Sequence, residues 1–298
     1  MLDNKLIPVV VALGYFDSVH RGHQKVIKTA VKQAKLTGAK TVVFTFKGDL
    51  KGVIAGCEDK VVFTPEERAV FIKDIGADEI YFAPVTESFL SMDKTEFLDF
   101  INGKFNIIGY VSGSDYRFGK GGQGSVSDVI KYAKEKGQFV VTAETLTENG
   151  EKISTTLIKK CLSDGNIVKA NNLLGRAYSV SGTVFKDRKV GRKLGFPTVN
   201  IKIVKDKHPL KDGVYFGSIE LDKKRYKTLI NYGARPTYSL SEKLIEAHIL
   251  DYSGELYGKN ITICFSGFLR EIIKFSDENG LRTQLLADLD KIRGKTYD

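Results

Sequence analysis

The sequence predicts an α/β domain followed by a β-barrel or sandwich, and three observations predict this fold class. The first half of the 298-residue chain alternates short apolar runs with amphipathic segments, the pattern of βαβ units around a parallel sheet. From Tyr178 onward, segments of alternating polarity are separated by turns rich in Gly and Lys, which is typical of antiparallel strands. A chain of this length usually forms two domains, and we place them at 1–165 and 166–298.

The expected elements of the first domain follow this alternation. Strands are expected at 7–13, 41–46, 79–82, 107–112 and 139–145, and helices at 23–36, 65–75, 94–103 and 127–136. Gly38 is a C-terminal helix stop. Thr64-Pro65-Glu66-Glu67 supplies an N-cap, a proline at the first helical position and acidic residues in the first turn. Two helix boundaries are therefore specified by local chemistry.

The second domain should consist of strands closed by one helix. Two short helix-like segments, the second ending near Leu174, lead into it. Strands are expected at 178–185, 214–221, 226–232, 245–250 and 261–265, with a further strand after Pro197. In Asp277–Arg293, four apolar residues recur at spacings of four, four and three, so we expect an amphipathic helix that packs on the barrel.

Composition limits the classes of function. The net charge is +10, and most of the excess lies after residue 160. These Lys and Arg residues are scattered and lack a stacking motif, so we expect phosphorylated small molecules rather than nucleic acid as partners. The three cysteines form no CxxC or Cys/His cluster, and no run of eighteen apolar residues occurs. We therefore expect a cytoplasmic protein with no membrane partner, as a monomer or weak homo-oligomer.

The first constellation of polar residues directly follows the first apolar strand. Gly14-Tyr15-Phe16-Asp17-Ser18-Val19-His20-Arg21-Gly22-His23 lies between that strand and the start of a helix, which is where parallel sheets bind ligands. His20 and His23 supply donors for phosphate oxygens, and Gly22 lets the backbone approach closely. Nucleotidyl transfer needs such donors rather than a protein nucleophile. The pattern favours a nucleotidyltransferase site over local capping by His20.

Two further segments of the first half suit a nucleotide or its acceptor. The stretch Gly113-Ser114-Asp115-Tyr116-Arg117-Phe118-Gly119 follows an apolar run and begins a glycine-rich, basic segment that could close over a substrate. Ile153-Ser154-Thr155-Thr156-Leu157-Ile158-Lys159 places hydroxyls at a helix start with a cation behind them. One of these hydroxyls can also serve as an ordinary N-cap.

These three elements, in this order and spacing, resemble the adenylyltransferase module of the prokaryotic bifunctional riboflavin kinase/FAD synthetase family, and more widely the HxGH nucleotidyltransferases. The resemblance implies a Rossmann-like domain in which His20 and His23 contact ATP phosphates. It also implies that Asp115 lies near substrate and that Ser154 and Thr155 hold the triphosphate.

In the first domain, the chain departs from that family at three places. Ser18 stands where the family usually has glycine, and Lys159 stands where it has arginine. Thr45-Phe46-Lys47-Gly48 stands where a proline–histidine–proline stretch is expected. Lysine keeps the charge of arginine but loses its bidentate fork, so a phosphate contact at 159 would be weaker and less directional.

The second constellation combines a basic loop with a strand. Gly191-Arg192-Lys193-Leu194-Gly195-Phe196-Pro197-Thr198-Val199-Asn200 places the hydroxyl of Thr198 and the amide of Asn200 on one face of a strand. Such oxygen ligands beside cations suit a magnesium–nucleotide complex. Glu246, in a later strand, is a candidate general base for a kinase that acts on an alcohol. A structural salt bridge for Glu246 is the alternative.

Together with this loop, the segments DGVYFG, NYGARPT and EAHILDYSGELYGK resemble the riboflavin kinase module of the same family from about residue 173 to 295. The resemblance implies a six-stranded β-barrel with a terminal helix, and conversion of riboflavin and ATP to FMN and ADP. Asp187 replaces a usual glycine in the preceding loop. Phe268, Leu269 and the terminal helix are expected to wall the flavin slot.

The predicted function is therefore phosphorylation of riboflavin by the second domain and adenylylation of FMN to FAD by the first, with Mg²⁺ accompanying ATP. Two alternatives stay open: a kinase with a weak or inactive adenylyltransferase domain, and a flavin-responsive RNA-binding regulator. The residues assigned to the sites are catalytic His20, His23 and Glu246; ATP-binding Gly14, Phe16, Asp17, Gly22, Ser154, Thr155, Lys159, Gly191, Arg192, Lys193, Gly195 and Pro197; substrate-binding Asp115, Arg117, Tyr215 and Arg270; and metal-binding Thr198 and Asn200.

Overall fold

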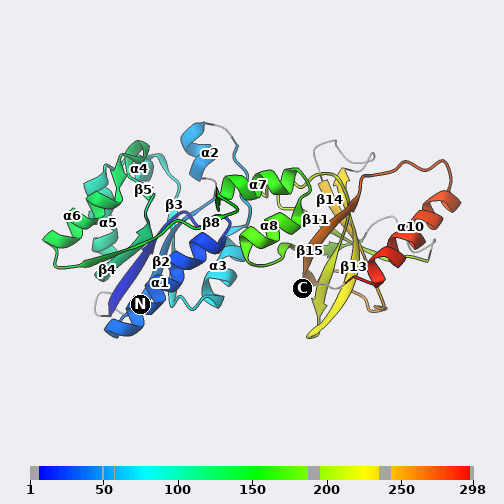
Figure 1. The fold of residues 1–298 in the computed structure, drawn as a ribbon, viewed down its shortest axis with the longest axis horizontal. Helices are drawn as coiled ribbons and strands as arrows, with labels where there is room; N and C mark the ends of the chain where they lie inside the picture. Colours follow the sequence, from blue (N-terminus) through cyan, green and yellow to red (C-terminus); the bar gives the residue numbers. More distant parts are fainter. Residues whose placement is uncertain (1–6, 49, 57, 187–194, 235–242, 296–298) are drawn as a thin grey trace. The chain divides into compact units, whose positions relative to one another are not determined.

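The computed structural model describes residues 7–48, 50–56, 58–186, 195–234 and 243–295. It divides the chain into two units, Met1–Leu157 and Ile158–Asp298 (Figure 1). The division lies within helix α7 (Thr155–Ser163). Each unit has its own sheet and its own hydrophobic clusters.

Unit 1 is built around a parallel sheet with the strand order β3-β2-β1-β4-β7. Its strands are β1 (Pro8–Leu13), β2 (Lys40–Lys47), β3 (Glu79–Pro84), β4 (Asn106–Gly113) and β7 (Phe139–Ala143). The chain moves outward from β1 to β3 and then crosses to β4 on the other side of β1. At such a switch point the carboxyl ends of neighbouring strands leave room for a ligand. The expected α/β fold is confirmed.

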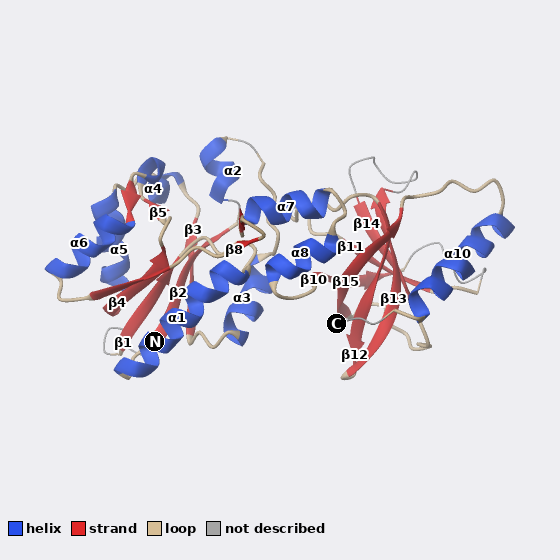
Figure 2. Cartoon of the chain, in the orientation of Figure 1, coloured by secondary structure: helices blue, strands red, loops and turns tan. Residues whose placement is uncertain are grey.

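Helices cover both faces of this sheet because its strands are apolar on both faces. In β1, Val9, Val11 and Leu13 join one hydrophobic cluster, whereas Val10 and Ala12 join another, as the alternation of side chains along a strand requires. Figure 2 shows helices on both sides of the strands. The first cluster includes α4 (Glu87–Leu90), α5 (Lys94–Lys104) and α6 (Val126–Glu135), and the second includes α1 (Arg21–Thr37) and α3 (Pro65–Asp74).

The helix boundaries that local chemistry predicted are confirmed. Gly38 ends α1 with a φ of 67° in the left-handed region. Thr64 and Glu67 form a capping box around Pro65 at the start of α3. The sequence did not reveal α2 (Leu50–Ala55), α4 or the 3₁₀ turn Lys120–Gly122, because these are too short to show a helical period. It also did not reveal two short hairpins, β5–β6 (Arg117–Phe118, Gly124–Ser125) and β8–β9 (Thr147–Glu148, Glu151–Lys152).

Unit 2 is a closed antiparallel barrel with the strand order β10-β11-β14-β13-β12-β15. Its strands are β10 (Tyr178–Phe185), β11 (Thr198–Lys202), β12 (Gly213–Leu221), β13 (Lys224–Ala234), β14 (Lys243–Ile249) and β15 (Asn260–Arg270). Helix α8 (Ile167–Leu174) packs against β10 and β15, and α10 (Glu278–Arg293) packs against β13. The expected barrel with a terminal helix is confirmed, and β11 begins directly after Pro197.

Alternation along the barrel strands separates an apolar interior from an outer face that carries polar groups. Ile201, Ile245 and Tyr232 are paired in register on β11, β14 and β13, and all three are buried inside the barrel. Their neighbours in sequence therefore point outward. On this outer face, Leu285, Leu289 and Ile292 of α10 pack against barrel residues that include Val214 and Leu229. The terminal helix thus converts part of the outer face into an enclosed site.

The described part of the chain includes two of the three cysteines, Cys161, which is buried, and Cys264, which is half-buried; neither forms a disulfide. Cys57 lies outside the described residues. Within those residues, no group of three or more His, Cys, Asp or Glu side chains could hold a metal ion. No helix in them is both long enough and apolar enough to cross a membrane.

Candidate active sites

A cavity of about 570 Å³ opens at the switch point of unit 1. Its walls come from the carboxyl ends of β1, β4 and β7 and from the loops that follow them. This volume is within the usual range of small-molecule sites. The cavity brings together most of the residues predicted for the first domain: Gly14, Phe16, His20, Gly22, His23, Asp115, Arg117, Ser154 and Thr155.

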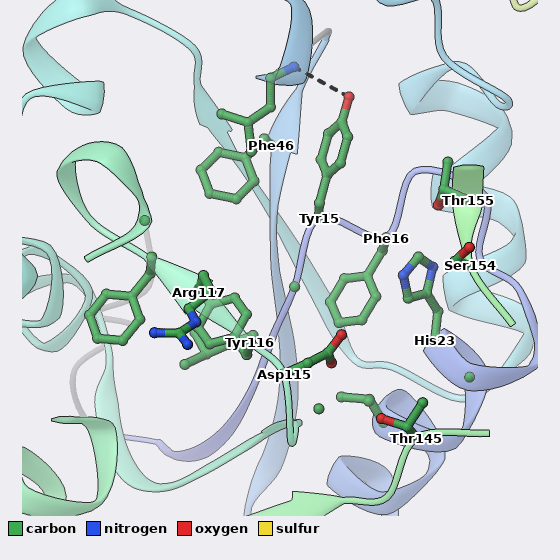
Figure 3. A pocket seen from close by; sticks show the side chains of 18 of the residues that line it. Tyr15, Phe16, His23, Phe46, Asp115, Tyr116, Arg117, Thr145, Ser154 and Thr155 are labelled. Carbon is green, nitrogen blue, oxygen red and sulfur yellow. Dashed lines mark hydrogen bonds between the residues drawn. The ribbon is translucent and has the colours of Figure 1, made fainter. Parts of the chain in front are cut away.

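The cavity has two ends of different chemistry. Figure 3 shows His23, Ser154 and Thr155 at one end, which we call the polar end, with Asp115 between them and the opposite side. The opposite side is the aromatic end, lined by Tyr15, Phe46, Phe89, Phe97, Tyr116 and Phe118. Hydroxyl and imidazole donors suit phosphates, whereas packed rings suit a planar aromatic ligand.

The two histidines are held in a fixed arrangement at the start of α1. His20 is the N-cap residue, and its Nδ1 accepts a hydrogen bond from the backbone N of His23 at 3.1 Å. The two rings stack with centroids 3.6 Å apart. Burial lowers the pKa of His20 to about 4, so its ring is neutral near pH 7. Because Nδ1 is an acceptor, the proton lies on Nε2 and can be donated to a phosphate oxygen.

The backbone of the loop after β1 is strained where it presents these rings. Phe16 and Val19 have φ values of 48° and 43°, a conformation that is costly for a β-branched residue. A Cβ on Gly22 would lie 3.0 Å from the His20 ring. Glycine at 22 therefore leaves room for the ring of His20.

Hydroxyl groups connect this loop to the start of α7. Ser18 Oγ and Thr155 Oγ1 are 2.9 Å apart, and both side chains are buried. Ser154 Oγ accepts a hydrogen bond from the backbone N of Leu157 at 3.2 Å. The serine that replaces the family's glycine at 18 thus helps to position the predicted phosphate-binding hydroxyls.

Asp115 forms an ion pair with Lys152 beside this polar end. The hydrogen bond from Lys152 is the main cause that lowers the pKa of the Asp115 carboxyl. Both side chains line the cavity.

Two residues predicted to bind ATP at this site, Asp17 and Lys159, do not line the cavity. Asp17 is 1% exposed, and its Oδ1 accepts a hydrogen bond from the backbone N of Val62 at 3.0 Å. This hydrogen bond connects the loop after β1 to Val62. Lys159 lies about one turn after the start of α7 and is not among the residues that line the cavity.

In the described part of unit 2, two cavities meet at strand β11. The first, of about 250 Å³, lies between the barrel and α10 and is lined by Thr198, Glu246 and Arg270 among the predicted residues. Leu281, Leu285 and Leu289 of α10 form its apolar wall. The second is lined by Pro197, Thr198, Asn200, Tyr252 and Tyr257, among others. Thr198 therefore lines both cavities.

Strand register brings the polar groups of this site together. Asn200 on β11 pairs with Glu246 on β14, and Glu246 pairs with Asn231 on β13. Asn231 Nδ2 donates to Glu246 Oε2 at 3.4 Å. His248, two residues further along β14, lies opposite Thr198, and its Nδ1 is 2.8 Å from Pro197 O. Because a carbonyl only accepts, that Nδ1 carries a proton.

Of the other residues predicted for unit 2, Arg270 lines a cavity and Tyr215 and Gly195 do not. Arg270 lines the cavity beside α10, but its Nε and Nη2 donate to Asp288 at 2.9 and 2.7 Å. Tyr215 is fully buried inside the barrel, where its hydroxyl donates to Lys211 O, so it lines none of the three cavities. Gly195 has a φ of 87° and also lies outside their walls. Gly191, Arg192, Lys193 and Asp187 lie outside the described residues.

The expected flavin walls are partly as the sequence suggested. Helix α10 lines the cavity, and Leu269 packs in the cluster beneath that helix. Phe268 instead packs its ring edge-to-face against Tyr215, with centroids 5.2 Å apart, and does not line the cavity.

Several polar residues that line these cavities were not selected from the sequence, among them Lys152, Asn231 and His248. The period-two alternation of strands could have found His248, which shares a face with Glu246. Asn231 could be identified only from the strand register, and Lys152 only from the position of the β8–β9 hairpin.

The fold and these cavities define an enzyme with two separate small-molecule sites. A family model described as FAD synthetase matches residues 3–157, and one described as riboflavin kinase matches residues 174–295. The chain belongs to the family of bifunctional riboflavin kinase/FMN adenylyltransferases, so the resemblance seen in the motifs is confirmed.

Several known proteins are similar over nearly the whole chain. The bifunctional riboflavin kinase/FMN adenylyltransferase of Listeria monocytogenes is 36% identical over 94% of this chain and 90% of its own length. The Bacillus subtilis protein of the same description is 33% identical over 94% of this chain and 90% of its own. A crystal structure described as a macrolide-efflux protein from Streptococcus pneumoniae is 28% identical, with a TM-score of 0.88, over 97% of this chain and 95% of that chain.

Proposed function

We propose that unit 2 transfers the γ-phosphoryl group of ATP to riboflavin and that unit 1 transfers the adenylyl group of a second ATP to the FMN formed. The observation that carries the first step is that Thr198 lines two cavities of different character. The observation that supports the second is the cavity at the switch point, with a polar and an aromatic end. We place the boundary of the two modules at residues 165 and 166.

In the kinase step, the apolar wall formed by α10 suits the isoalloxazine ring, and the cavity on the other side of β11 suits the nucleotide. The terminal hydroxyl of the ribityl chain would then lie near Glu246. Glu246 accepts the hydroxyl proton as that oxygen bonds to the γ-phosphorus and the bond to ADP breaks. Asn231, which donates to Glu246, orients the carboxylate.

The donor set of β11 fits a magnesium ion that arrives with ATP. Thr198 and Asn200 offer a hydroxyl and an amide oxygen beside the nucleotide cavity, and Mg²⁺ takes oxygen ligands from a few protein groups together with phosphates and water. When bound, the ion neutralises phosphate charge. The protein's contribution is to hold the nucleotide and to place the acceptor hydroxyl.

In the adenylyl step, the aromatic end holds the flavin and the polar end holds the triphosphate. A phosphate oxygen of FMN bonds to the α-phosphorus, and the bond to pyrophosphate breaks. His20 Nε2, His23, Ser154 and Thr155 donate to the phosphates, so charge that develops on them is stabilised without a protein nucleophile. The basic composition of the chain fits these anionic substrates; we propose that it acts in the cytoplasm, as a monomer or weak homo-oligomer, without nucleic acid.

The test is to separate the two reactions by substitution. Glu246→Gln should lower FMN formation from riboflavin by about 100-fold or more, because a general base contributes that much. It should leave FAD formation from supplied FMN unchanged. His23→Ala should have the opposite effect. Chromatographic analysis of flavin products from each variant measures both reactions.

Two outcomes would contradict this assignment. If both substitutions reduce both reactions equally, the two sites are not independent. If the unsubstituted protein makes FMN but no FAD from FMN, ATP and magnesium, the chain is a kinase alone, as its departures at Phe46 and Lys159 allow.

A further inference from the structure

We propose that Lys152 binds the pyrophosphate part of ATP at the unit 1 site, and that it does so by exchanging its ion pair with Asp115 for one with the phosphates. This proposal rests on the proposed adenylylation by unit 1. It adds a phosphate-binding cation that lies outside the histidine and hydroxyl motifs.

The first observation is the scarcity of positive charge around the cavity. Of the lining residues that the structure describes, Lys152 and Arg117 are the two with permanent positive charge. Figure 3 shows Arg117 beside Tyr116, toward the aromatic end. Lys159, the cation expected behind the hydroxyls, does not line the cavity. The polar end therefore has one lysine available for a ligand that carries about four negative charges.

The second observation is the position of Lys152 in the chain. It ends β9, and two residues later the chain reaches Ser154 and then Thr155 at the start of α7. Besides burial, the positive charge of Lys152 lowers the pKa of His20, and the negative charge of Asp115 raises it. Both charges thus act on the ring that is expected to donate to phosphate.

The direction of the reaction assigns Lys152 to the leaving group. Phosphoryl-type transfers proceed with the attacking and leaving oxygens roughly in line. If the flavin occupies the aromatic end, the FMN phosphate approaches the α-phosphorus from that side. The departing pyrophosphate then lies on the side of Ser154, Thr155 and Lys152. Its charge grows as the α-phosphorus bond to the bridging oxygen breaks, and an ammonium group there stabilises it.

The exchange of partners is energetically accessible. The side chains of Lys152 and Asp115 are 51% and 57% exposed, and an ion pair this exposed contributes at most about 1 kcal/mol. A triphosphate carries several charges and accepts charge-assisted hydrogen bonds. The flexible stem of lysine allows its ammonium to move between the two partners. In the ligand-free protein, Asp115 thus serves as a temporary counter-ion.

The test compares Lys152→Ala with Lys152→Arg and with Lys94→Ala. Lys94 is a matched control, because it is also 51% exposed and pairs with an aspartate, Asp128, and neither residue of this pair lines the cavity. Lys152→Ala should raise the KM for pyrophosphate in the reverse reaction, FAD plus pyrophosphate giving FMN and ATP, by about 10- to 100-fold, as expected for loss of a hydrogen bond to a charged group. The KM for FAD should stay within about threefold of the parent value, and Lys152→Arg should restore most of the loss.

A binding measurement keeps the proposal independent of turnover. Calorimetric titration of the full chain with magnesium pyrophosphate should show binding that Lys152→Ala weakens and Lys94→Ala does not. If the parent protein forms no FAD, the proposed adenylylation fails, and the titration alone then decides whether Lys152 binds pyrophosphate. If Lys152→Ala and Lys94→Ala behave alike in both measurements, or the KM for FAD rises as much as that for pyrophosphate, Lys152 does not have this role.

Discussion

The two sites of this chain are built in opposite ways. In unit 1, many of the candidate site residues lie on the loops and helix starts that follow the parallel strands, so residues close in sequence, such as His20 and His23, line one cavity. In unit 2, they lie on the strands themselves, and register brings together Asn200, Asn231 and Glu246, which are far apart in sequence. Side chains proposed to bind nucleotides can therefore be positioned either by strained loops or by the register of regular strands.

The two constructions also depend on different supports. The loop after β1 is held by buried polar contacts, including the hydrogen bond between Ser18 and Thr155 and the carboxylate of Asp17. The barrel site needs a separate wall, which α10 supplies. That helix is attached by the ion pair of Arg270 with Asp288, and Lys227 donates to the carbonyl groups at its C-terminal end.

The largest effect is expected where the wall of the barrel site is attached. Asp288 is fully buried, and Arg270 is only 16% exposed on its side chain. Asp288→Asn would leave a guanidinium without its charge partner, so we expect the free energy of unfolding of unit 2 to fall by about 3–5 kcal/mol. Hydrogen exchange of the α10 amides should quicken, and the KM for riboflavin should rise.

Asp290→Asn is the matched control on the same helix, because its side chain is 78% exposed. It should change stability by about 0.5 kcal/mol or less. If both variants have the same small effect on α10 exchange, that ion pair does not hold the wall. A loss of FAD formation from FMN in Asp288→Asn would show that the supports of the two sites are not separate.

The next effect is a dependence of unit 1 on pH. Burial lowers the pKa of His20 from 6.5 to about 4. Between these values the unfolded chain binds a proton that the folded unit does not, so stability falls as the pH falls from about 6.5 toward 4. The full loss is about 3 kcal/mol. Denaturant unfolding of unit 1 at several pH values measures it.

His20→Asn should remove this loss, because asparagine can still cap α1 but does not titrate. The stability of the variant and of the parent should therefore converge as the pH is lowered. An equally steep fall in the variant would assign the acid sensitivity to another group. Unit 2, which does not contain His20, provides the internal reference.

The sequence predicted most of the fold because strong local signals coincide with it. The apolar runs of β1, β2 and β4 and the cap residues Gly38 and Thr64 are readable one segment at a time. The histidine pair was readable for the same reason, since its loop is continuous in sequence. Short elements such as α2 have no period to detect, and only tertiary contacts determine them.

Long-range geometry explains what the sequence did not reveal. Tyr215 alternates with outward-facing neighbours on β12, and only the closed barrel shows that it points inward. Arg270, which is predicted to bind substrate, lines the cavity and also donates to Asp288, which lies in a helix whose docking the sequence did not specify. Lys152 could not be selected from the sequence, because an exposed lysine in a two-residue strand has no distinguishing sequence pattern.

The smallest effect concerns the serine that departs from the family pattern. Ser18 is fully buried and 2.9 Å from the hydroxyl of Thr155, which is also buried. Ser18→Ala should destabilise unit 1 by about 1 kcal/mol, because the hydroxyl of Thr155 loses this partner away from water.

The control for this prediction is Ser181→Ala in the barrel. Its hydroxyl lies 2.8 Å from Thr262 but is exposed, so water replaces the lost bond. The two variants therefore compare a loop support with an exposed strand contact. If Ser18 also positions Thr155 for phosphate, Ser18→Ala should raise the KM for ATP in FAD formation several-fold while FMN formation is unchanged. Equal stability losses in the two variants, with no change in that KM, would mean that the contact between Ser18 and Thr155 supports neither the loop nor the site.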